Sequence, residues 1–254
     1  MSLTPESLLI LFVGFLAGTV NTVVGSGSLL TFPTLIALGY PPLIANVSNN
    51  IGLAPGSLSG AIGYRRELAG QRAVAIRLGV VAAVGGATGA ALLLLLPASA
   101  FERIVPVLIL VACGLVIAQP RLSALARART VGPHERPGLD PLLPLAVGGT
   151  GVYGGYFGAA QGVILMALLG VLVDDDLQRI NALKNVLTAI VNGTAAVIFA
   201  LTTAVAWDAA LLLAVGSVVG GQAGARLGRR IPPTLLRVVI VTVGLLVVLR
   251  YVLR

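Results

Sequence analysis

The feature that most constrains this chain is a succession of apolar runs, several of which are as long as a lipid bilayer is thick. A bilayer core about 30 Å thick is crossed by roughly 20 helical residues. Residues 43–63 contain no charged side chain. Of the 254 residues, 57% are hydrophobic and only 10% are charged, whereas a soluble domain is about a quarter charged. The sequence therefore predicts an all-α, polytopic membrane protein.

The apolar segments form two sets of five, separated by a polar stretch. The first set comprises residues 8–24, 29–38, 43–63, 74–96 and 104–118, and the second comprises residues 142–153, 157–173, 180–201, 207–225 and 235–249. In each set the first two segments are short or are separated by glycine, which predicts a broken or re-entrant helical hairpin. We expect an N-terminal transmembrane repeat at 1–118, a basic cytoplasmic linker at 119–140 and a C-terminal transmembrane repeat at 141–254.

The two sets are related by an internal repeat. At an offset of 135 residues, the asparagine-rich segment 46–50 falls on 181–185, and the glycine-rich segment 84–90 falls on 219–225. Duplication of one ancestral unit accounts for matches that keep their order and spacing. Chance matching within a Gly- and Leu-rich composition is the alternative.

Basic residues indicate the direction of each half, because Lys and Arg are retained on the cytoplasmic side of a membrane. Most of the 17 basic residues form three clusters, namely Arg65, Arg66, Arg72 and Arg77; Arg121, Arg127, Arg129 and Arg136; and Arg226, Arg229, Arg230 and Arg237. The counterparts of the first and third clusters, residues 200–212 and 91–102, contain no basic residue. The repeats are therefore predicted to be inverted, with five crossings each if both hairpin arms count. Both termini then face outward, against which Arg250 and Arg254 argue mildly.

Inverted repeats with broken helices are typical of secondary transporters, in which the interruptions meet near the membrane midplane. Such a chain forms one transport domain and works by alternating access. Gly25, Ser26, Gly27 and Ser28 let the backbone approach a small ligand, and the amino-terminal end of the next helix carries a positive partial charge. The expected solute is therefore a small anion. The comparable residues of the second half are Tyr153, Gly154, Gly155, Tyr156, Gly158 and Gln161.

A polar triplet with helical spacing follows each hairpin, so that each triplet lies on one helix face. The triplets are Asn46, Asn49 and Asn50, and Asn181, Lys184 and Asn185. Because an unpaired polar group is costly in hydrocarbon, these faces are expected to look inward, either toward a solute or toward a neighbouring helix. Lys184 is the only lysine of the chain and is suited to neutralise an anion. Alternatively, the Lys184 side chain extends to the cytoplasmic interface of the membrane.

Other motifs receive structural interpretations. Glycines at four-residue spacing predict close helix packing; they are Gly52, Gly56 and Gly60, and Gly216, Gly220, Gly224 and Gly228. Asp174, Asp175 and Asp176 are expected to form a solvated cap before the next helix. The single histidine, His134, lies in the linker, and the single cysteine, Cys113, lies within an apolar run. No metal site, cofactor or disulfide is therefore predicted, and the net charge of +8 is assigned to membrane-facing loops rather than to a nucleic-acid partner.

Several motifs resemble one family. They are the run at residues 14–18, the turn at 25–28, the segment at 32–35 and the small-polar segment at 45–50. In this order and spacing they are similar to motifs of the sulfite exporter TauE/SafE (TSUP) family, and residues 151–170 and 181–185 look like its repeat. The resemblance implies a multi-pass permease of the bacterial plasma membrane for sulfite, thiosulfate or organosulfonates. The asparagine-rich positions, where many members carry Thr-Ser, and the shorter glycine run depart from the usual pattern.

The leading hypothesis is therefore a secondary transporter, not an enzyme, whose partners are a small anionic solute and the lipid bilayer. Transport of another organic anion, such as a carboxylate, is the alternative; import or export, proton coupling and homodimerisation stay open. An intramembrane hydrolase would use Ser26 or Ser28 as its nucleophile, but the only histidine lies in the linker and no base is available. A non-transporting scaffold built on the glycines would not need interrupted helices.

Overall fold

The computed structural model describes residues 4–129, 142–173, 175–227 and 233–252, which form ten α-helices and no strand. The first half contains α1 (Pro5–Val23), α2 (Ser28–Ala37), α3 (Pro42–Gly63), α4 (Arg72–Leu95) and α5 (Ala98–Arg129). The second half contains α6 (Leu142–Tyr156), α7 (Gln161–Leu172), α8 (Leu177–Thr202), α9 (Trp207–Leu227) and α10 (Pro233–Val252). Among them, α1, α4, α5, α8 and α9 are long and apolar enough to cross a membrane. The predicted all-α membrane fold is confirmed.

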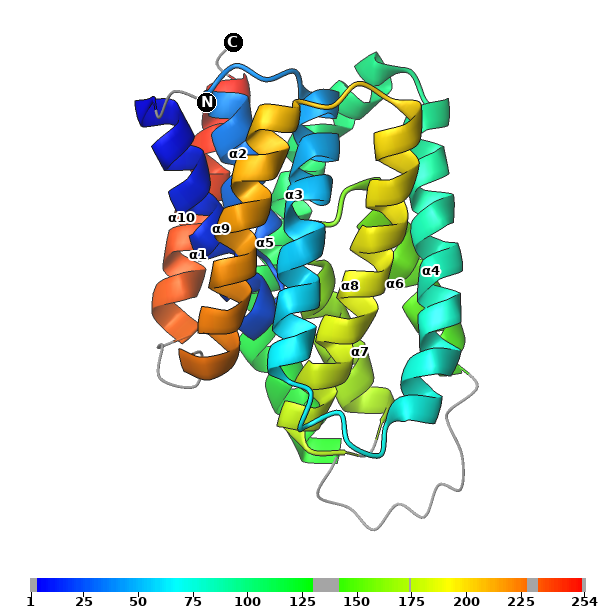
Figure 1. The fold of residues 1–254 in the computed structure, drawn as a ribbon. Helices are drawn as coiled ribbons and strands as arrows, with labels where there is room; N and C mark the ends of the chain where they lie inside the picture. The colour runs from blue at the N-terminus through cyan, green and yellow to red at the C-terminus, as the bar shows by residue number, and fades with distance from the viewer. Residues whose placement is uncertain (1–3, 130–141, 174, 228–232, 253–254) are drawn as a thin grey trace.

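The two hairpins enter the bundle from opposite ends (Figure 1). Helix α1 begins and α2 ends at the upper end, whereas α6 begins and α7 ends at the lower end. The return arms α2 and α7 have 10 and 12 residues, which reach only about 15–18 Å at about 1.5 Å per residue. The lengths of these arms favour a re-entrant hairpin over two crossings, a choice that the sequence left open.

Two predicted boundaries differ from the structure. Helix α5 continues to Arg129, past the expected end of its span at residue 118. The polar residues beyond that point are rich in Leu, Ala and Arg, which favour helix, so that polarity alone was a poor sign of a linker. The expected turn at Gly154 and Gly155 lies inside α6, and the chain breaks only at residues 157–160.

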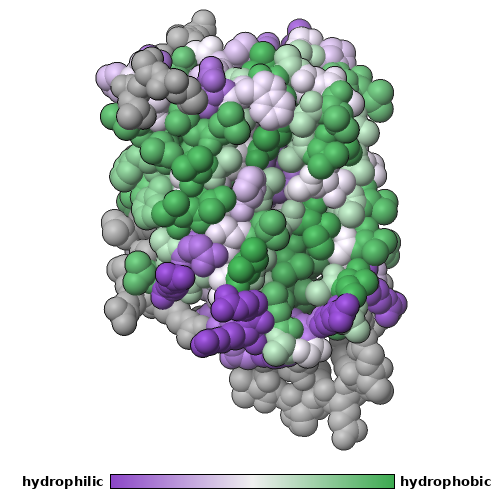
Figure 2. Space-filling model, viewed as in Figure 1, coloured by the Kyte–Doolittle hydropathy of each residue, from purple (hydrophilic) through white to green (hydrophobic). Residues whose placement is uncertain are grey.

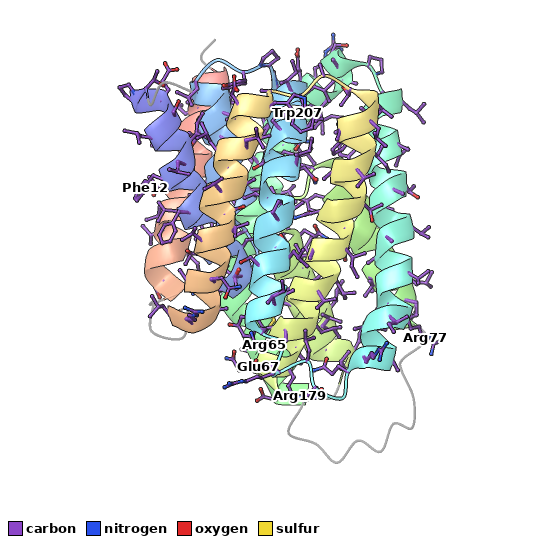
Figure 3. The ribbon with its side chains drawn as sticks, in the orientation of Figure 1. Phe12, Arg65, Glu67, Arg77, Arg179 and Trp207 are labelled. Carbon is purple, nitrogen blue, oxygen red and sulfur yellow. The ribbon has the colours of Figure 1, made fainter. Side chains whose placement is uncertain are left out.

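Charged and apolar side chains are distributed as a bilayer requires. Arg65, Arg77 and Arg179 lie at the lower end, Trp207 lies at the upper end, and Phe12 points away from the bundle (Figure 3). Apolar side chains cover the middle of the visible face, and hydrophilic ones gather at its lower end (Figure 2). The described members of all three basic clusters belong to helix ends or loops at this lower end (Figure 1). Its assignment to the cytoplasm stays a prediction.

Some of the residues interpreted from the sequence lie outside the described part of the chain. They are His134, Arg136, Asp174, Gly228, Arg229 and Arg230, together with the linker from residue 130 to 140 and the terminal Arg254.

Glycine allows the closest helix pairs to form. Helix α9 packs against α1 and α3. A Cβ atom at Gly220 of α9 would lie 2.0 Å from the Phe15 carbonyl oxygen of α1, and one at Gly56 of α3 would lie 2.5 Å from the Ser217 side chain. The described glycines of both predicted ladders make such contacts, so the ladders serve close packing as expected.

The pattern of helix contacts repeats with the halves exchanged. Helix α1 packs on α9, and α6, its counterpart in sequence order, packs on α4. In the same way α3 with α9 matches α8 with α4, and α2 with α10 matches α7 with α5. Helices α3 and α8 pack on each other, as do α5 and α10. Each half is therefore built around elements of the other.

The turns of the two hairpins meet inside the bundle. Gly25 and Gly158 adopt left-handed backbone conformations, with φ of +91° and +77°, which glycine adopts without a Cβ penalty. The N–H of Gly162 in α7 donates to the carbonyl of Gly25 at 3.0 Å. A Cβ atom at Gly25 would lie 2.4 Å from the Gly162 Cα atom. The interrupted chains are therefore in direct backbone contact.

Replacement of Gly220 by alanine is expected to lower the thermal unfolding temperature in detergent, because the new methyl group overlaps the Phe15 carbonyl. Overpacking of this kind costs about 1–3 kcal/mol. Gly193→Ala is the matched control, since no atom lies within 4 Å of the added methyl group. That variant should melt at or slightly above the wild-type temperature, because alanine favours helix. Equal melting of the two variants would contradict close packing of α1 on α9.

Replacement of Gly25 by alanine is expected to destabilise the protein more than the same change at Gly39. Both glycines have similar φ angles, +91° and +93°, so both variants carry a backbone strain of about 1–2 kcal/mol. Only Gly25 has a close neighbour, because nothing lies within 4 Å of a Cβ atom at Gly39. The difference between the two unfolding temperatures isolates the contact between the hairpin turns, and a zero difference would show that the turns do not touch.

Candidate functional site

The polar face of α8 holds the carboxyl-terminal end of α1. Lys184 Nζ donates to the carbonyl oxygens of Asn21 at 3.0 Å and Thr22 at 3.2 Å. The side-chain amides of Asn181 and Asn185 also donate to the Thr22 carbonyl, at 3.4 and 3.3 Å. Carbonyls in the last turn of a helix lack intrahelical partners and form the negative end of its dipole. The predicted triplet of the second half thus surrounds an interrupted helix of the first.

The polar face of α3 plays the corresponding part for the other hairpin. Asn46 Nδ2 donates at 3.0 Å to the carbonyl of Tyr156, the last residue of α6. Asn49 Oδ1 accepts a hydrogen bond from the Thr31 hydroxyl of α2. Asn50 Oδ1 is buried, and it has no hydrogen-bond partner in the described part of the chain. Bonding between helices therefore accounts for some, but not all, of this face.

The amino-terminal end of α2 has unpaired N–H groups, whereas the first N–H groups of α7 donate to the carbonyls of Gly158, Gly25 and Ala160. No side chain caps α2 at Gly27 or α7 at Ala160. The N–H groups of Ser26, Gly27 and Ser28 donate no hydrogen bond to any described residue. Unpaired N–H groups at the positive end of a helix favour an anion.

Nine buried side-chain atoms have no hydrogen-bond partner among the described residues, and all belong to the hairpins or to the inward faces of α3 and α8. They are Thr22 Oγ1, Ser26 Oγ, Asn46 Oδ1, Asn50 Oδ1, Tyr156 OH, both polar atoms of the Gln161 side chain, Asn181 Oδ1 and Thr188 Oγ1. We call these residues, together with Asn49, Lys184 and Asn185, the central polar cluster. Each unpartnered buried polar atom lowers the stability of the fold by about 1–3 kcal/mol. A group of nine such atoms therefore indicates a place for a polar solute or for water.

The cluster contains a buried amino group without a carboxylate partner. Lys184 is only 1% exposed, and no described carboxylate forms an ion pair with its side chain. An uncompensated charge in such a position is expensive. The alternative in which Lys184 reaches the membrane interface is wrong, because its ammonium group binds the end of α1 instead.

Two predicted site residues hold the turns in place. The Tyr153 hydroxyl donates at 2.6 Å to the Ala159 carbonyl and closes the turn between α6 and α7. A Cβ atom at Gly27 would lie 2.3 Å from the Ala17 carbonyl, so glycine is required there for packing within the first hairpin. These contacts position the cluster whether or not the same residues touch a solute.

The sequence interpretation missed a second layer of polar residues. Asn21 Nδ2 and Asn192 Nδ2 both donate to the Ser57 hydroxyl, at 3.0 and 3.2 Å. Asn192 follows Asn185 by seven residues, which is two helical turns along the same face, and this spacing was a usable signal. Thr188 gave no comparable signal, because threonine in a helix commonly bonds to its own backbone.

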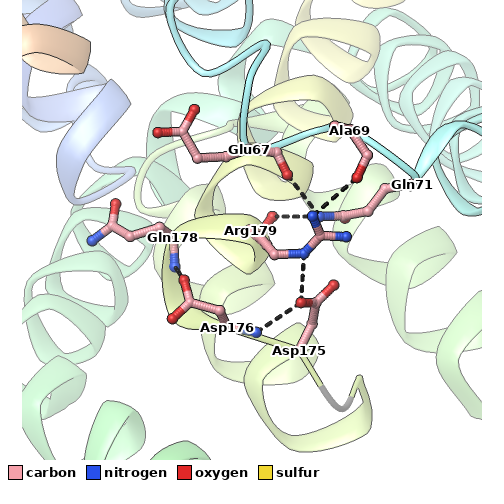
Figure 4. Close-up of polar contacts among 7 residues, drawn as sticks. All are labelled: Glu67, Ala69, Gln71, Asp175, Asp176, Gln178 and Arg179. Carbon is pink, nitrogen blue, oxygen red and sulfur yellow. Dashed lines mark hydrogen bonds and ion pairs between the residues drawn. The ribbon is translucent and has the colours of Figure 1, made fainter.

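The aspartates after α7 have a structural role at the lower end (Figure 4). Asp176 accepts the Gln178 N–H at 2.8 Å and caps α8, as predicted. Asp175 pairs with Arg179 at 2.6 Å, and Arg179 also donates to the Ala69 carbonyl at 2.9 Å. These bonds tie the loop between α3 and α4 to the start of α8.

The larger described grooves do not suit an anion. One groove of about 570 Å³ is lined by apolar residues of α3 and α8 together with Trp207. A second, of about 540 Å³, lies between α4 and α8 and is apolar except for Gln71 and Arg72 at one end. Such surfaces are expected on helices that face lipid.

Comparison with known proteins agrees with the resemblance drawn from the sequence. The chain is 30% identical over 234 residues to the "Probable membrane transporter protein YfcA" of Escherichia coli (strain K12), an alignment that covers 92% of this chain and 84% of the relative. It is 27% identical over 259 residues to a "Probable membrane transporter protein" of Haemophilus influenzae, which covers 99% and 97%. A Sinorhizobium relative, "Probable membrane transporter protein ORF9", is 27% identical over 220 residues, covering 86% and 82%. No solved structure matches the chain.

The model of the family described as "Sulfite exporter TauE/SafE" matches residues 10–251, nearly the whole chain. With this match and the apolar helices described above, the protein is a multi-pass membrane transporter of the bacterial plasma membrane. The chain belongs to the sulfite exporter TauE/SafE family.

Proposed function

We propose that this transporter is a permease for small sulfur-containing oxyanions, which bind in the central polar cluster. The observation that carries the proposal is Lys184, whose buried amino group donates hydrogen bonds only to carbonyl oxygens and has no carboxylate partner in the described chain. An anion would supply the missing negative charge. It would also accept hydrogen bonds from unpaired donors of the cluster, namely the hydroxyls of Ser26 and Tyr156 and the Gln161 Nε2 group.

The proposed site combines hydrogen-bond donors of several kinds. Backbone N–H groups come from Ser26, Gly27 and Ser28, next to Gly25, whose own N–H donates to the Val20 carbonyl. Side chains with donor groups belong to Asn46, Asn49, Asn50, Tyr156, Gln161, Asn181, Lys184 and Asn185. Tyr153 completes the set by holding the second turn through its bond to the Ala159 carbonyl. A charge-assisted hydrogen bond to an oxyanion is roughly twice as strong as a neutral one. The anion therefore gains most from Lys184 and is oriented by the amides.

A sulfur oxyanion suits a site with many donors. Its oxygens point in several directions and accept bonds from more than one helix at once, whereas a carboxylate offers two oxygens in one plane. The family description names sulfite, while the names of the relatives specify no solute. A small carboxylate is the second candidate.

We propose that the two halves are inverted repeats. Movement of one half against the other would then give alternating access to the site. Hairpins that enter from opposite ends and the exchanged helix contacts support this assignment. So does the bond from Asn192 to Ser57, which joins two residues 135 positions apart, the offset of the sequence repeat. A bond between equivalent residues lies on or near the two-fold axis that relates them.

Lys184→Met should reduce thiosulfate uptake into proteoliposomes at subsaturating concentration by about tenfold to a hundredfold. The variant keeps the volume of the side chain and removes its charge-assisted bond, which contributes about 1.5–3 kcal/mol. Uptake is measured with radiolabelled thiosulfate, and sulfite, methanesulfonate and acetate are tested as competitors. Stronger competition by the sulfur oxyanions than by acetate is the expected order.

Arg77→Met is the matched control, because it removes an exposed cation at the lower end of the bundle, outside the cluster. It should transport as the wild type does. Thermal unfolding in detergent establishes that both variants fold. If the Lys184→Met variant folds and takes up thiosulfate as fast as the wild type does, Lys184 is not part of the site. Stronger competition by acetate than by the sulfur oxyanions would favour the carboxylate candidate.

A further inference from the structure

The hydrogen bonds of Lys184 match those of a neutral amine. A neutral amine has two N–H bonds and a lone pair, whereas an ammonium group has three N–H bonds. Lys184 has two acceptors, the carbonyl oxygens of Asn21 and Thr22. No third acceptor lies within hydrogen-bond distance among the described residues. The third N–H of the charged form therefore needs an acceptor that the described chain does not supply.

The charged groups near Lys184 do not compensate it. Of the elements that pack on or bond to α8, α7 carries no titratable side chain, and α6 carries only Tyr153 and Tyr156. The titratable groups of α1, α3, α4 and the connecting loops lie at the helix ends, as do those of α8 other than Lys184; they are Glu6, Tyr64, Arg65, Arg66, Glu67, Arg72, Arg77, Asp175, Asp176 and Arg179. Arg179 is paired with Asp175. None of these described groups therefore pairs with a charged Lys184 inside the bundle.

We propose that Lys184 takes up one proton together with the anion, so that the two are transported in the same direction. This inference rests on the proposed function, because it assigns the proton to the same site. The amine lone pair binds a proton from water on the loading side, and the resulting ammonium donates its third N–H to an oxygen of the anion. When the anion leaves on the other side, the proton returns to water there, and the neutral amine keeps its bonds to Asn21 and Thr22.

Proton and anion binding are then coupled through a single atom. Coupling between two ligands is reciprocal, so protonation strengthens anion binding by the same factor by which the anion strengthens protonation. The affinity for the anion rises as the pH falls, by up to about tenfold per pH unit while the empty site is neutral. In this scheme the proton is carried by Lys184, so the coupling needs no carboxylate inside the membrane.

The test measures thiosulfate and proton movement together in proteoliposomes that contain a trapped pH indicator. An inward thiosulfate gradient should acidify the lumen by one proton for each anion transported. Thiosulfate is suitable because its own charge is constant around neutral pH. Its binding to the purified protein, measured by calorimetry, should strengthen toward acidic pH.

Lys184→Arg is the informative variant, because arginine stays charged at every accessible pH. It should retain anion binding, lose its pH dependence, and carry no protons with any residual uptake. Arg77→Met should keep both the proton flux and the pH dependence of the wild type. If Lys184→Arg does not fold, the wild-type proton flux and binding curve decide the question alone.

The outcomes separate this inference from the proposed function. Wild-type thiosulfate uptake without luminal acidification, and with affinity that is independent of pH, overturns the proton inference and leaves the permease in place. Absence of uptake and binding of thiosulfate, sulfite and methanesulfonate by the folded wild-type protein overturns both.

Discussion

The arrangement of this protein depends on one constraint: a backbone carbonyl or N–H group inside a bilayer needs a hydrogen-bond partner. Two helices are interrupted within the bundle, and each leaves such groups behind. The carbonyls at the end of α1 are bound by Asn181, Lys184 and Asn185, and the end of α6 is bound by Asn46. In both cases the partner comes from the opposite half, so the polar faces that the interruptions require also join the halves.

This dependence links the proposed solute site to movement. A shift of one half against the other changes the bonds between a hairpin and the helix that caps it. A bound anion can then accept hydrogen bonds from Lys184 and the asparagine amides when these groups leave the carbonyls. The close contact of Gly25 with Gly162 makes the turns sensitive to the same shift. Hydrolysis at Ser26 has no support in this arrangement, since its hydroxyl is buried and is not hydrogen-bonded to a base among the described residues, and the family is one of membrane transporters.

Much of the fold was predictable because a bilayer allows few solutions. Run lengths identified the spanning helices, and helical spacing placed Asn181, Lys184 and Asn185 on one face. The end of α5 and the position of the break after α6 were not predictable, because polar helices resemble linkers and because Gly154 serves packing while Gly158 makes the turn. The bonds from Lys184 to the backbone carbonyls of α1 were also not predictable, since every residue has a backbone carbonyl and the sequence does not mark which ones accept a bond. The cytoplasmic face, the linker beyond Arg129 and the solute-binding role of the cluster stay predictions.

The central claim is that an anion binds to the side chain of Lys184, and the composition of the chain permits a direct test. Because the chain contains a single lysine, biosynthetic labelling with ¹⁵N-lysine gives a single Nζ resonance by nuclear magnetic resonance when no affinity tag adds another. We expect this resonance to shift toward its ammonium position as thiosulfate is added, with saturation at the concentration that saturates binding measured by calorimetry. A resonance that does not move while thiosulfate binds would place the anion elsewhere and contradict the account.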